Sequence, residues 1–186
     1  MIELKPLSLQ DAEQIRLWRN QCLETLRTPY PLTVEQQADW YIETVCNRSA
    51  NARWFGVWKP KSNFVRCPGS EDMPEPKQSP PTLIGYAGIE NISWENRIGE
   101  ISLLIDPQYH GKGYGKQAAN AVLDYAFDNL NLHTVYGECY LSNPAVDFWK
   151  KITAEREGYT TTLPCRKYHG GQYYGSLYFS IEREEK

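Results

Sequence analysis

The sequence predicts an α/β fold: a single mixed central β-sheet flanked by helices. The expected elements run strand, two helices, several consecutive strands, helix, strand, helix and two strands. This order is not that of a repeating βαβ array and favours one central sheet. The chain has 186 residues, which suits one domain with a sizeable core. We therefore expect residues 1–186 to form a single domain.

The N-terminal part is expected to hold a short strand at residues 2–6 and two helices. Ser8 followed by Asp11 is a capping signature, and it predicts that the first helix begins just after Ser8. A second capping box starts at Thr33 and predicts a helix that continues to about Cys46. Prolines between these helices separate them.

The middle of the chain predicts a strand at 53–58, then a loop insertion at about 59–81 that contains six prolines. Cys67 lies inside this insertion and is expected to be exposed. A substrate-binding lid is the functional alternative for the segment. Two further strands are expected at 82–92 and 97–106.

The C-terminal part contains the strongest helical pattern in the chain. Its apolar residues are Ala118, Ala119, Val122, Leu123, Ala126, Phe127 and Leu130. A strand is expected at 134–141, a helix from 144 to about 155, and two closing strands near 159–164 and 174–182.

Composition excludes several classes of function. The net charge is −3 and the Lys and Arg residues are scattered, which argues against nucleic acid or a membrane surface as partner. No run of about 18 apolar residues and no apolar signal core occurs. Five cysteines without a CxxC pair indicate reduced thiols in a cytoplasmic protein. Three separated histidines predict no metal site.

The segment from Ile101 to Gln117 is the most informative part of the sequence. A strand runs into a turn with alternating glycines at Gly111, Gly113 and Gly115, and the turn opens a helix. Glycine permits positive φ and lets a ligand approach the backbone. Successive N–H groups and the start of the helix then favour an anion, so the segment predicts a phosphate or pyrophosphate site.

Two common phosphate motifs do not match. A P-loop requires Ser or Thr after its lysine, and Lys116 is followed by Gln117. A dinucleotide fingerprint requires the spacing GxGxxG near the first strand, which is not the spacing here. A turn that binds nothing is disfavoured, because three alternating glycines cost backbone entropy.

The segment His110-Gly111-Lys112-Gly113-Tyr114-Gly115 resembles motif A of the GNAT superfamily of N-acetyltransferases, with His110 in the Gln/Arg position. The run from Asp106 to Gly115 most resembles the subgroup that includes ribosomal-protein N-terminal and related small-molecule acetyltransferases. This resemblance implies the GNAT fold, acetyl-CoA as co-substrate, an amine acceptor, no metal and a possible homodimer.

The same resemblance implies which residues hold the cofactor. Backbone groups of Leu103, Leu104 and Ile105 would pair with the pantetheine arm like an added strand. Backbone N–H groups from Gly111 to Lys116 would hold the pyrophosphate. The implied cofactor-binding residues are Leu103, Leu104, Ile105, His110, Gly111, Lys112, Gly113, Tyr114, Gly115, Lys116, Asn143 and Trp149.

Two catalytic assignments follow from the resemblance. Glu100, on the strand that leads to the glycine-rich turn, would be the general base, directly or through water. Its alternative is a solvated strand residue paired with a cation. The backbone N–H of Leu103 or a near neighbour would stabilise the developing oxyanion.

The general acid is less defined. The segment 143–151 resembles motif B, in which a tyrosine often protonates the thiolate, but Trp149 occupies the aromatic position here. Tyr140, Ser142 or solvent are the alternatives. Asn143 would bond the pantetheine or cap the following helix.

The sequence thus predicts acetyl transfer to a primary amine by direct attack. An acyl-cysteine route is disfavoured because no cysteine lies in the motif. The alternatives are a CoA-binding sensor or interaction module, supported by Trp149, and an enzyme that acetylates one partner's N-terminus. Acceptor choice is expected to depend on residues 26–33, the turn at Trp94 and residues 167–174.

Overall fold

A computed structural model describes residues 1–27, 30–61 and 80–183. It contains a seven-stranded sheet in the order β1-β2-β3-β4-β5-β7-β6. Neighbouring strands are antiparallel except β4 and β5, which are parallel. The predicted fold class is therefore confirmed. The strands are β1 Glu3–Lys5, β2 Arg53–Lys59, β3 Thr82–Ser93, β4 Ile98–Ile105, β5 Thr134–Tyr140, β6 Tyr159–His169 and β7 Gln172–Glu182.

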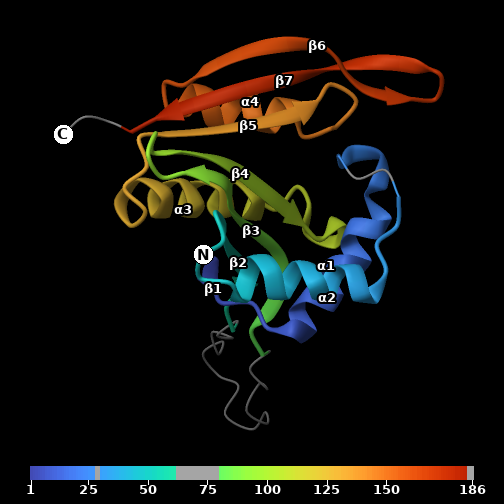
Figure 1. The fold of residues 1–186 in the computed structure, drawn as a ribbon, viewed down its shortest axis with the longest axis vertical. Coiled ribbons are helices and arrows are strands. Elements are labelled where there is room, and N and C mark those ends of the chain that lie inside the picture. Colours follow the sequence, from blue (N-terminus) through green and yellow to red (C-terminus); the bar gives the residue numbers. More distant parts are fainter. Residues whose placement is uncertain (28–29, 62–79, 184–186) are drawn as a thin grey trace, which may run out of the picture.

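Helices cover both faces of the sheet (Figure 1). One hydrophobic cluster packs α3 and α4 against one face, and a second packs α1 and α2 against the other face of β2 to β4. The helical elements are α1 Leu9–Gln21, η1 Leu23–Thr25, α2 Val34–Trp40, η2 Tyr41–Cys46, η3 Pro107–Tyr109, α3 Tyr114–Asp128 and α4 Val146–Glu155.

Both predicted capping boxes are present. Ser8 Oγ accepts the N–H of Asp11 at 3.3 Å, and the Asp11 carboxylate accepts the N–H of Ser8 at 2.8 Å. Thr33 exchanges the same pair of bonds with Gln36. The second helix differs from the prediction, because α-helical bonding ends at Trp40 and residues 41–46 continue as a π-helix.

The closing hairpin is longer than the sequence predicts. β6 does not end at Pro164 but continues to His169. A bulge between Leu163 and Lys167 accommodates the proline, since proline in a strand is tolerated at bulges and edges. Gly170 and Gly171, with φ of +57° and +84°, then form the turn into β7.

The sheet splits between its two parallel strands. β4 and β5 pair at three positions, Ile98 with Thr134, Gly99 with Val135 and Glu100 with Tyr136. β5 then follows β7 while β4 follows β3, and the two strands diverge (Figure 1). We call this opening the splay. Beyond Glu100, the β5-facing edge of β4 has no strand partner in the described residues.

Several expectations concern features away from the sheet. Most of the predicted proline-rich insertion, with Cys67, lies outside the described residues. The four described cysteines, Cys22, Cys46, Cys139 and Cys165, form no disulfide with one another. Within the described ranges, no helix has the length and apolar character needed to span a membrane.

Gly137 offers a test of how tightly β5 packs. A Cβ placed there would lie 2.3 Å from the ring of Phe179, and that ring is stacked on Trp149 with centroids 4.7 Å apart. We predict that Gly137→Ala lowers the free energy of unfolding by about 1–3 kcal/mol, because a packed ring must shift. Urea denaturation measures the change.

The matched control is Gly115→Ala, whose added Cβ would make an ordinary 3.6 Å contact with Phe148 inside α3. Its free energy of unfolding should stay within about 1 kcal/mol of the original or rise, because alanine favours the helix. Equal stability losses in the two variants would contradict the packing described.

Candidate active site

The glycine-rich turn is an open cradle. Gly111 and Gly113 have φ of +73° and +78°, and a Cβ on either would have no atom within 4 Å. Lys112 between them does not have positive φ, so the sign of φ alternates as in backbone nests that bind anions. Gly115 lies inside α3 without positive φ. Two of the three glycines are therefore required by the backbone.

The start of α3 supplies uncapped donors. Gly113 is its N-cap and offers no side chain to the first turn. The first backbone hydrogen bond of the helix runs from Gln117 N–H to Gly113 O at 3.3 Å. In the described part of the chain, the N–H groups of Tyr114, Gly115 and Lys116 have no acceptor. Together with the helix dipole, these N–H groups could hold a phosphate oxygen.

Side chains around the cradle stabilise its shape. The His110 ring donates from Nε2 to the carbonyl oxygen of Ile105 at 2.8 Å, and this bond joins the two ends of the turn. Lys112 Nζ donates to Gln108 O at 2.8 Å, and Lys116 Nζ pairs with Glu155 at 2.7 Å. The backbone N–H groups of this turn thus remain available for a ligand.

The β4 backbone is oriented differently at neighbouring residues. Asp106 N–H donates to Ile84 O on β3 at 2.9 Å. Antiparallel strands use alternate residues for these bonds, so the backbone groups of Leu104 also face β3. Those of Leu103 and Ile105 point into the splay. Of the three predicted pantetheine partners, Leu103 therefore presents both polar groups, Leu104 presents neither, and the Ile105 carbonyl is engaged by the turn.

Glu100 lies at the apex of the splay and is 5% exposed. Its carboxylate accepts Asn91 Nδ2 at 2.9 Å and pairs with the Arg27 guanidinium. Asn91, with φ of +52°, sits in a bulge of β3, and such bulges redirect side chains. Glu100 is thus held by two partners on the face opposite α3.

Glu90 and Tyr136 flank Glu100 on the two neighbouring strands. Burial, with the charge of Glu100, raises the pKa of Glu90. Burial raises the pKa of the Tyr136 phenol, and Glu100 adds to the rise. The phenol therefore keeps its proton at neutral pH, and its ring stacks on Tyr178 with centroids 5.9 Å apart.

Glu138 is the third carboxylate on this face. Arg166 donates to it from Nε at 2.8 Å and from Nη2 at 3.2 Å, and Ser176 Oγ donates at 2.6 Å. The hydrogen bond from Arg166 is the main cause that lowers the pKa of Glu138. Arg27 Nη2 lies 4.0 Å from the same carboxylate. Arg27 therefore lies between Glu100 and Glu138.

The two predicted residues of motif B have other neighbours. Asn143 Oδ1 accepts Ala145 N–H at 2.8 Å, and its Nδ2 donates to Thr25 O at 3.2 Å, so it shapes the turn before α4 and fastens η1. Trp149 is 8% exposed and stacks on Phe179 in the core. An indole packed in this way is a core residue, and it offers no acid.

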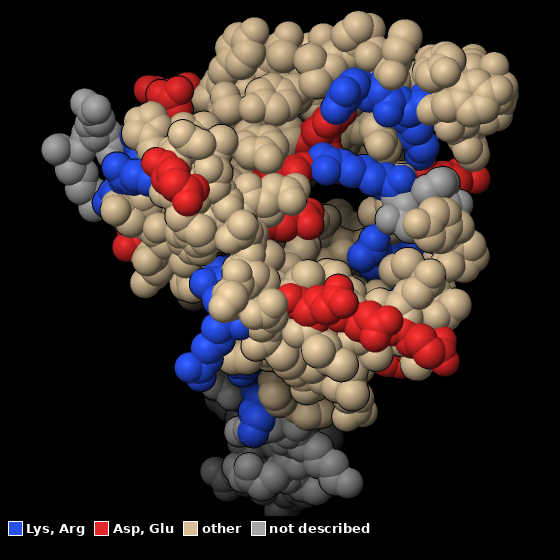
Figure 2. Space-filling view, in the orientation of Figure 1, with Lys and Arg blue, Asp and Glu red and all other residues tan. Residues whose placement is uncertain are grey.

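The segments expected to select the acceptor are partly brought together. Arg27, from residues 26–33, and Lys167, from residues 167–174, both reach this face. Lys167 Nζ donates to Glu24 O and lies 4.9 Å from the Tyr140 ring centroid. Figure 2 shows positive and negative side chains meeting around a hollow in this face. Trp94 is instead held in the turn before β4 by Asn51, at 3.0 Å.

Sequence reasoning missed Glu90, Asn91, Tyr136, Glu138 and Arg166, and it included Arg27 only as one of residues 26–33. One signal was available: Tyr136, Glu138 and Tyr140 alternate with buried residues along β5, which places them on one face. The register between β3 and β4 had no such signal, and it is this register that sets Glu90 beside Glu100.

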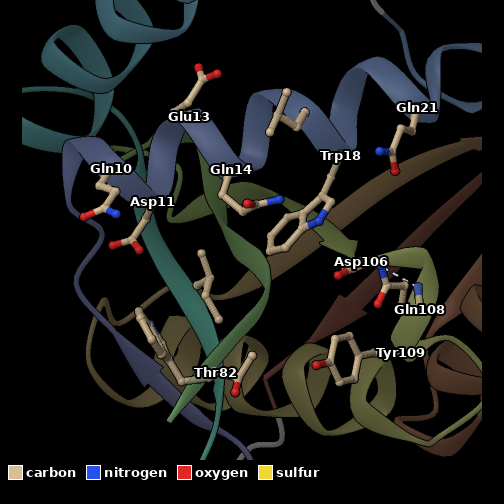
Figure 3. A pocket seen from close by; sticks show the side chains of 13 residues that line it. Gln10, Asp11, Glu13, Gln14, Trp18, Gln21, Thr82, Asp106, Gln108 and Tyr109 are labelled. Carbon is tan, nitrogen blue, oxygen red and sulfur yellow. Dashed lines mark hydrogen bonds between the residues drawn. The ribbon is translucent and has the colours of Figure 1, made fainter. Parts of the chain in front are cut away.

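A separate cavity of about 760 Å³ lies between α1 and the ends of β2 and β3. In Figure 3, Asp11, Gln14 and Trp18 of α1 point toward Thr82 and Tyr109 across it. Its described lining contains none of the predicted site residues, so it is distinct from the cradle and the splay.

Comparison with known proteins adds a family match and several relatives. Residues 2–147 match the family model of the acetyltransferase (GNAT) domain. An uncharacterized N-acetyltransferase of Bacillus subtilis strain 168 is 35% identical over 87 residues, which cover 46% of this chain and 49% of that protein. The spermidine N(1)-acetyltransferase of Vibrio cholerae is 35% identical over 78 residues, covering 41% and 45%. The match thus spans about half the length of these curated relatives.

Solved structures agree on the fold. The spermidine N-acetyltransferase of Vibrio cholerae in complex with CoA and spermine has a TM-score of 0.74 and 21% identity, covering 97% of this chain and 95% of that one. The expected likeness to ribosomal-protein acetyltransferases is not supported, because the relatives found here are spermidine acetyltransferases and uncharacterized N-acetyltransferases.

The cradle can be tested through its positive-φ glycine. We predict that Gly113→Val weakens CoA binding at least about tenfold, roughly 1.4 kcal/mol, because a β-branched residue disfavours φ of +78°. Isothermal titration calorimetry with CoA measures this.

Gly170→Val is the matched control, since Gly170 also has positive φ and open space around it, at the hairpin tip. Its CoA affinity should stay unchanged. Normal CoA affinity of Gly113→Val would exclude the cradle as the pyrophosphate site.

Proposed function

The chain belongs to the GNAT acetyltransferase family, and on this basis we propose that it transfers the acetyl group of acetyl-CoA to a primary amine by direct attack in a ternary complex. The observation that carries the proposal is the splay, where an unpaired strand edge leads from a buried carboxylate to an uncapped helix start. Residues 1–186 would act as one domain.

The residues present suit acetyl-CoA. The open backbone cradle at Gly111 and Gly113 accommodates the pyrophosphate, because no side chain fills it. The N–H and C=O of Leu103 point into the splay, where an amide-bearing pantetheine arm satisfies them as a strand would. Acetyl-CoA supplies an acetyl group already activated as a thioester.

The chain's own residues would manage protons and charge. Glu100, directly or through water, takes the proton that the ammonium must lose before its nitrogen attacks the thioester carbon. The Leu103 N–H donates to the carbonyl oxygen as negative charge develops there. The carbon–sulfur bond then breaks, and the thiolate leaves and takes up one proton.

We assign Tyr136 as the donor of that last proton. Its phenol lies on the face of Glu100, opposite it in the parallel pair, and its raised pKa keeps it protonated. Trp149 offers no acid, and the Tyr140 ring lies against the Lys167 ammonium. Ser142 is exposed, where solvent competes with it.

A small-molecule amine is the acceptor that the relatives support, because three curated relatives are spermidine N(1)-acetyltransferases. Acetylation of a protein N-terminus is the second candidate, and peptide acceptors test it. A CoA-binding module is the third, and tight CoA binding without turnover on any amine would establish it. A solved relative is described as dodecameric, which supports self-association but not a dimer in particular.

The base assignment gives a direct test. We predict that Glu100→Gln lowers kcat by about 10²–10⁴-fold and leaves CoA affinity unchanged. The reason is that the carboxylate lies on the sheet face opposite α3, which we call the acceptor face, and not in the cradle. Thiol release from acetyl-CoA measures kcat as a function of pH with any accepted amine.

Glu95→Gln, in the exposed turn before β4, is the control and should behave as the parent protein. A Glu100→Gln enzyme whose kcat and pH profile both match the parent would remove Glu100 as the base.

A further inference from the structure

We propose that the acceptor of this protein is a small primary amine that also carries an anionic group, a carboxylate or a phosphate, and that Arg27 binds this group. The inference rests on the proposed function and specifies its substrate class. It departs from the polyamines named for the relatives, and the arrangement of charges at the acceptor face is what supports it.

Each carboxylate of this face already has a cationic neighbour. Glu100 is paired with Arg27, and Glu138 holds Arg166 in a two-point contact. Glu90 is influenced by the positive charges of Arg27 and Arg19. A polyamine binds through several carboxylates that are free to receive ammonium groups. Here its ammonium groups would have to compete with two half-exposed guanidinium groups for these carboxylates, at the cost of the hydrogen bonds already made.

Arg27 has donor capacity to spare. Within the described residues, Nη2 alone of its nitrogens makes contacts, with Glu100 and, at 4.0 Å, with Glu138. Its side chain is 49% exposed. A guanidinium presents five N–H donors in a planar fork that matches a carboxylate or phosphate. The remaining edge of Arg27 can therefore receive an anion while Nη2 still holds Glu100.

A second and a third cation reinforce this position. Arg166 lies on the other side of Glu138, and its side chain is 50% exposed. Its pKa is raised by the hydrogen bond to Glu138, while the charge of Arg27 acts in the opposite sense. The two guanidinium groups lie on either side of Glu138, and their exposed edges add to the positive potential that an anionic substrate group meets. The ammonium of Lys167 is buried nearby, over Tyr140.

The geometry also separates the two ends of such a substrate. The amine belongs at Glu100, at the apex of the splay and on the strand that carries the Leu103 N–H. Arg27, which follows η1, contacts the same carboxylate, so an anionic group on Arg27 would lie within a few bonds of the reacting nitrogen. The amine of the substrate would therefore meet Glu100, and its anionic group would meet Arg27.

The test compares acceptors that differ in one charge. Steady-state acetylation by the full chain is measured for amino acids beside their carboxamides, for ω-aminocarboxylates beside n-alkylamines, for phosphoethanolamine beside ethanolamine, and for spermidine. We expect kcat/KM at least about tenfold higher for the anionic member of a pair, the scale of a charge-assisted contact. Comparing the carboxylate pairs with the phosphate pair shows which of the two anionic groups the protein prefers.

Arg27→Gln should reduce the ratio between paired acceptors to near one. Loss of the Arg27–Glu100 contact slows both members of a pair alike, so a merely structural role would leave the ratio unchanged. Arg48→Gln removes the same charge from an exposed turn and should keep the parental ratio. Unchanged CoA affinity shows that each variant is folded.

Two results would overturn the inference. Neutral amines or spermidine acetylated as well as the anionic members would refute it and leave amine acetylation standing. CoA binding without acetylation of any amine would refute the proposed function and this inference with it.

Discussion

The unpaired edge of β4 is the constraint on which the rest of the site depends. A buried backbone N–H or C=O without a partner costs free energy comparable to a lost hydrogen bond, yet β4 and β5 part after three paired positions. β5 is committed to β7, and β4 to β3. The backbone groups of Leu103, a half-buried residue, are therefore left to solvent or to a ligand. In the proposed complex, an extended ligand with its own amides would satisfy them.

The position of this opening explains the placement of the chemistry. The last paired residue of β4 is Glu100, so the carboxylate lies where the ligand would end. The strand then runs into the cradle and the start of α3, where the opposite, anionic end of the ligand would lie. In the proposed function, one strand would thus set the spacing between the general base and the pyrophosphate site. The face opposite α3 remains for the acceptor.

Most of the fold could be predicted from the sequence, and within the candidate site the glycine-rich turn could be predicted better than the surroundings of Glu100. The glycines, the capping boxes and the helical spacing of α3 are local signals, and the structure contains the elements that they indicate. Leu103 and Leu104 could not be distinguished, because the direction of a backbone group depends on which residues of β3 pair with β4. The Arg27–Glu100 contact joins residues 73 positions apart, and no periodicity reports such a pair.

The segment formed by η1 and the two residues after it, Leu26 and Arg27, separates acceptor contacts from cofactor contacts along the chain in the proposed function. Lys167 and Asn143 bind η1 at Glu24 and Thr25. A short segment that is not part of the cradle thus places Arg27 beside Glu100. Arg166 and Lys167 lie beyond residue 147, where the family match ends. If the proposed roles hold, divergence within these stretches changes which amine is accepted and leaves the CoA-binding residues unchanged. The specificity for the acceptor could thus evolve separately from the binding of the cofactor.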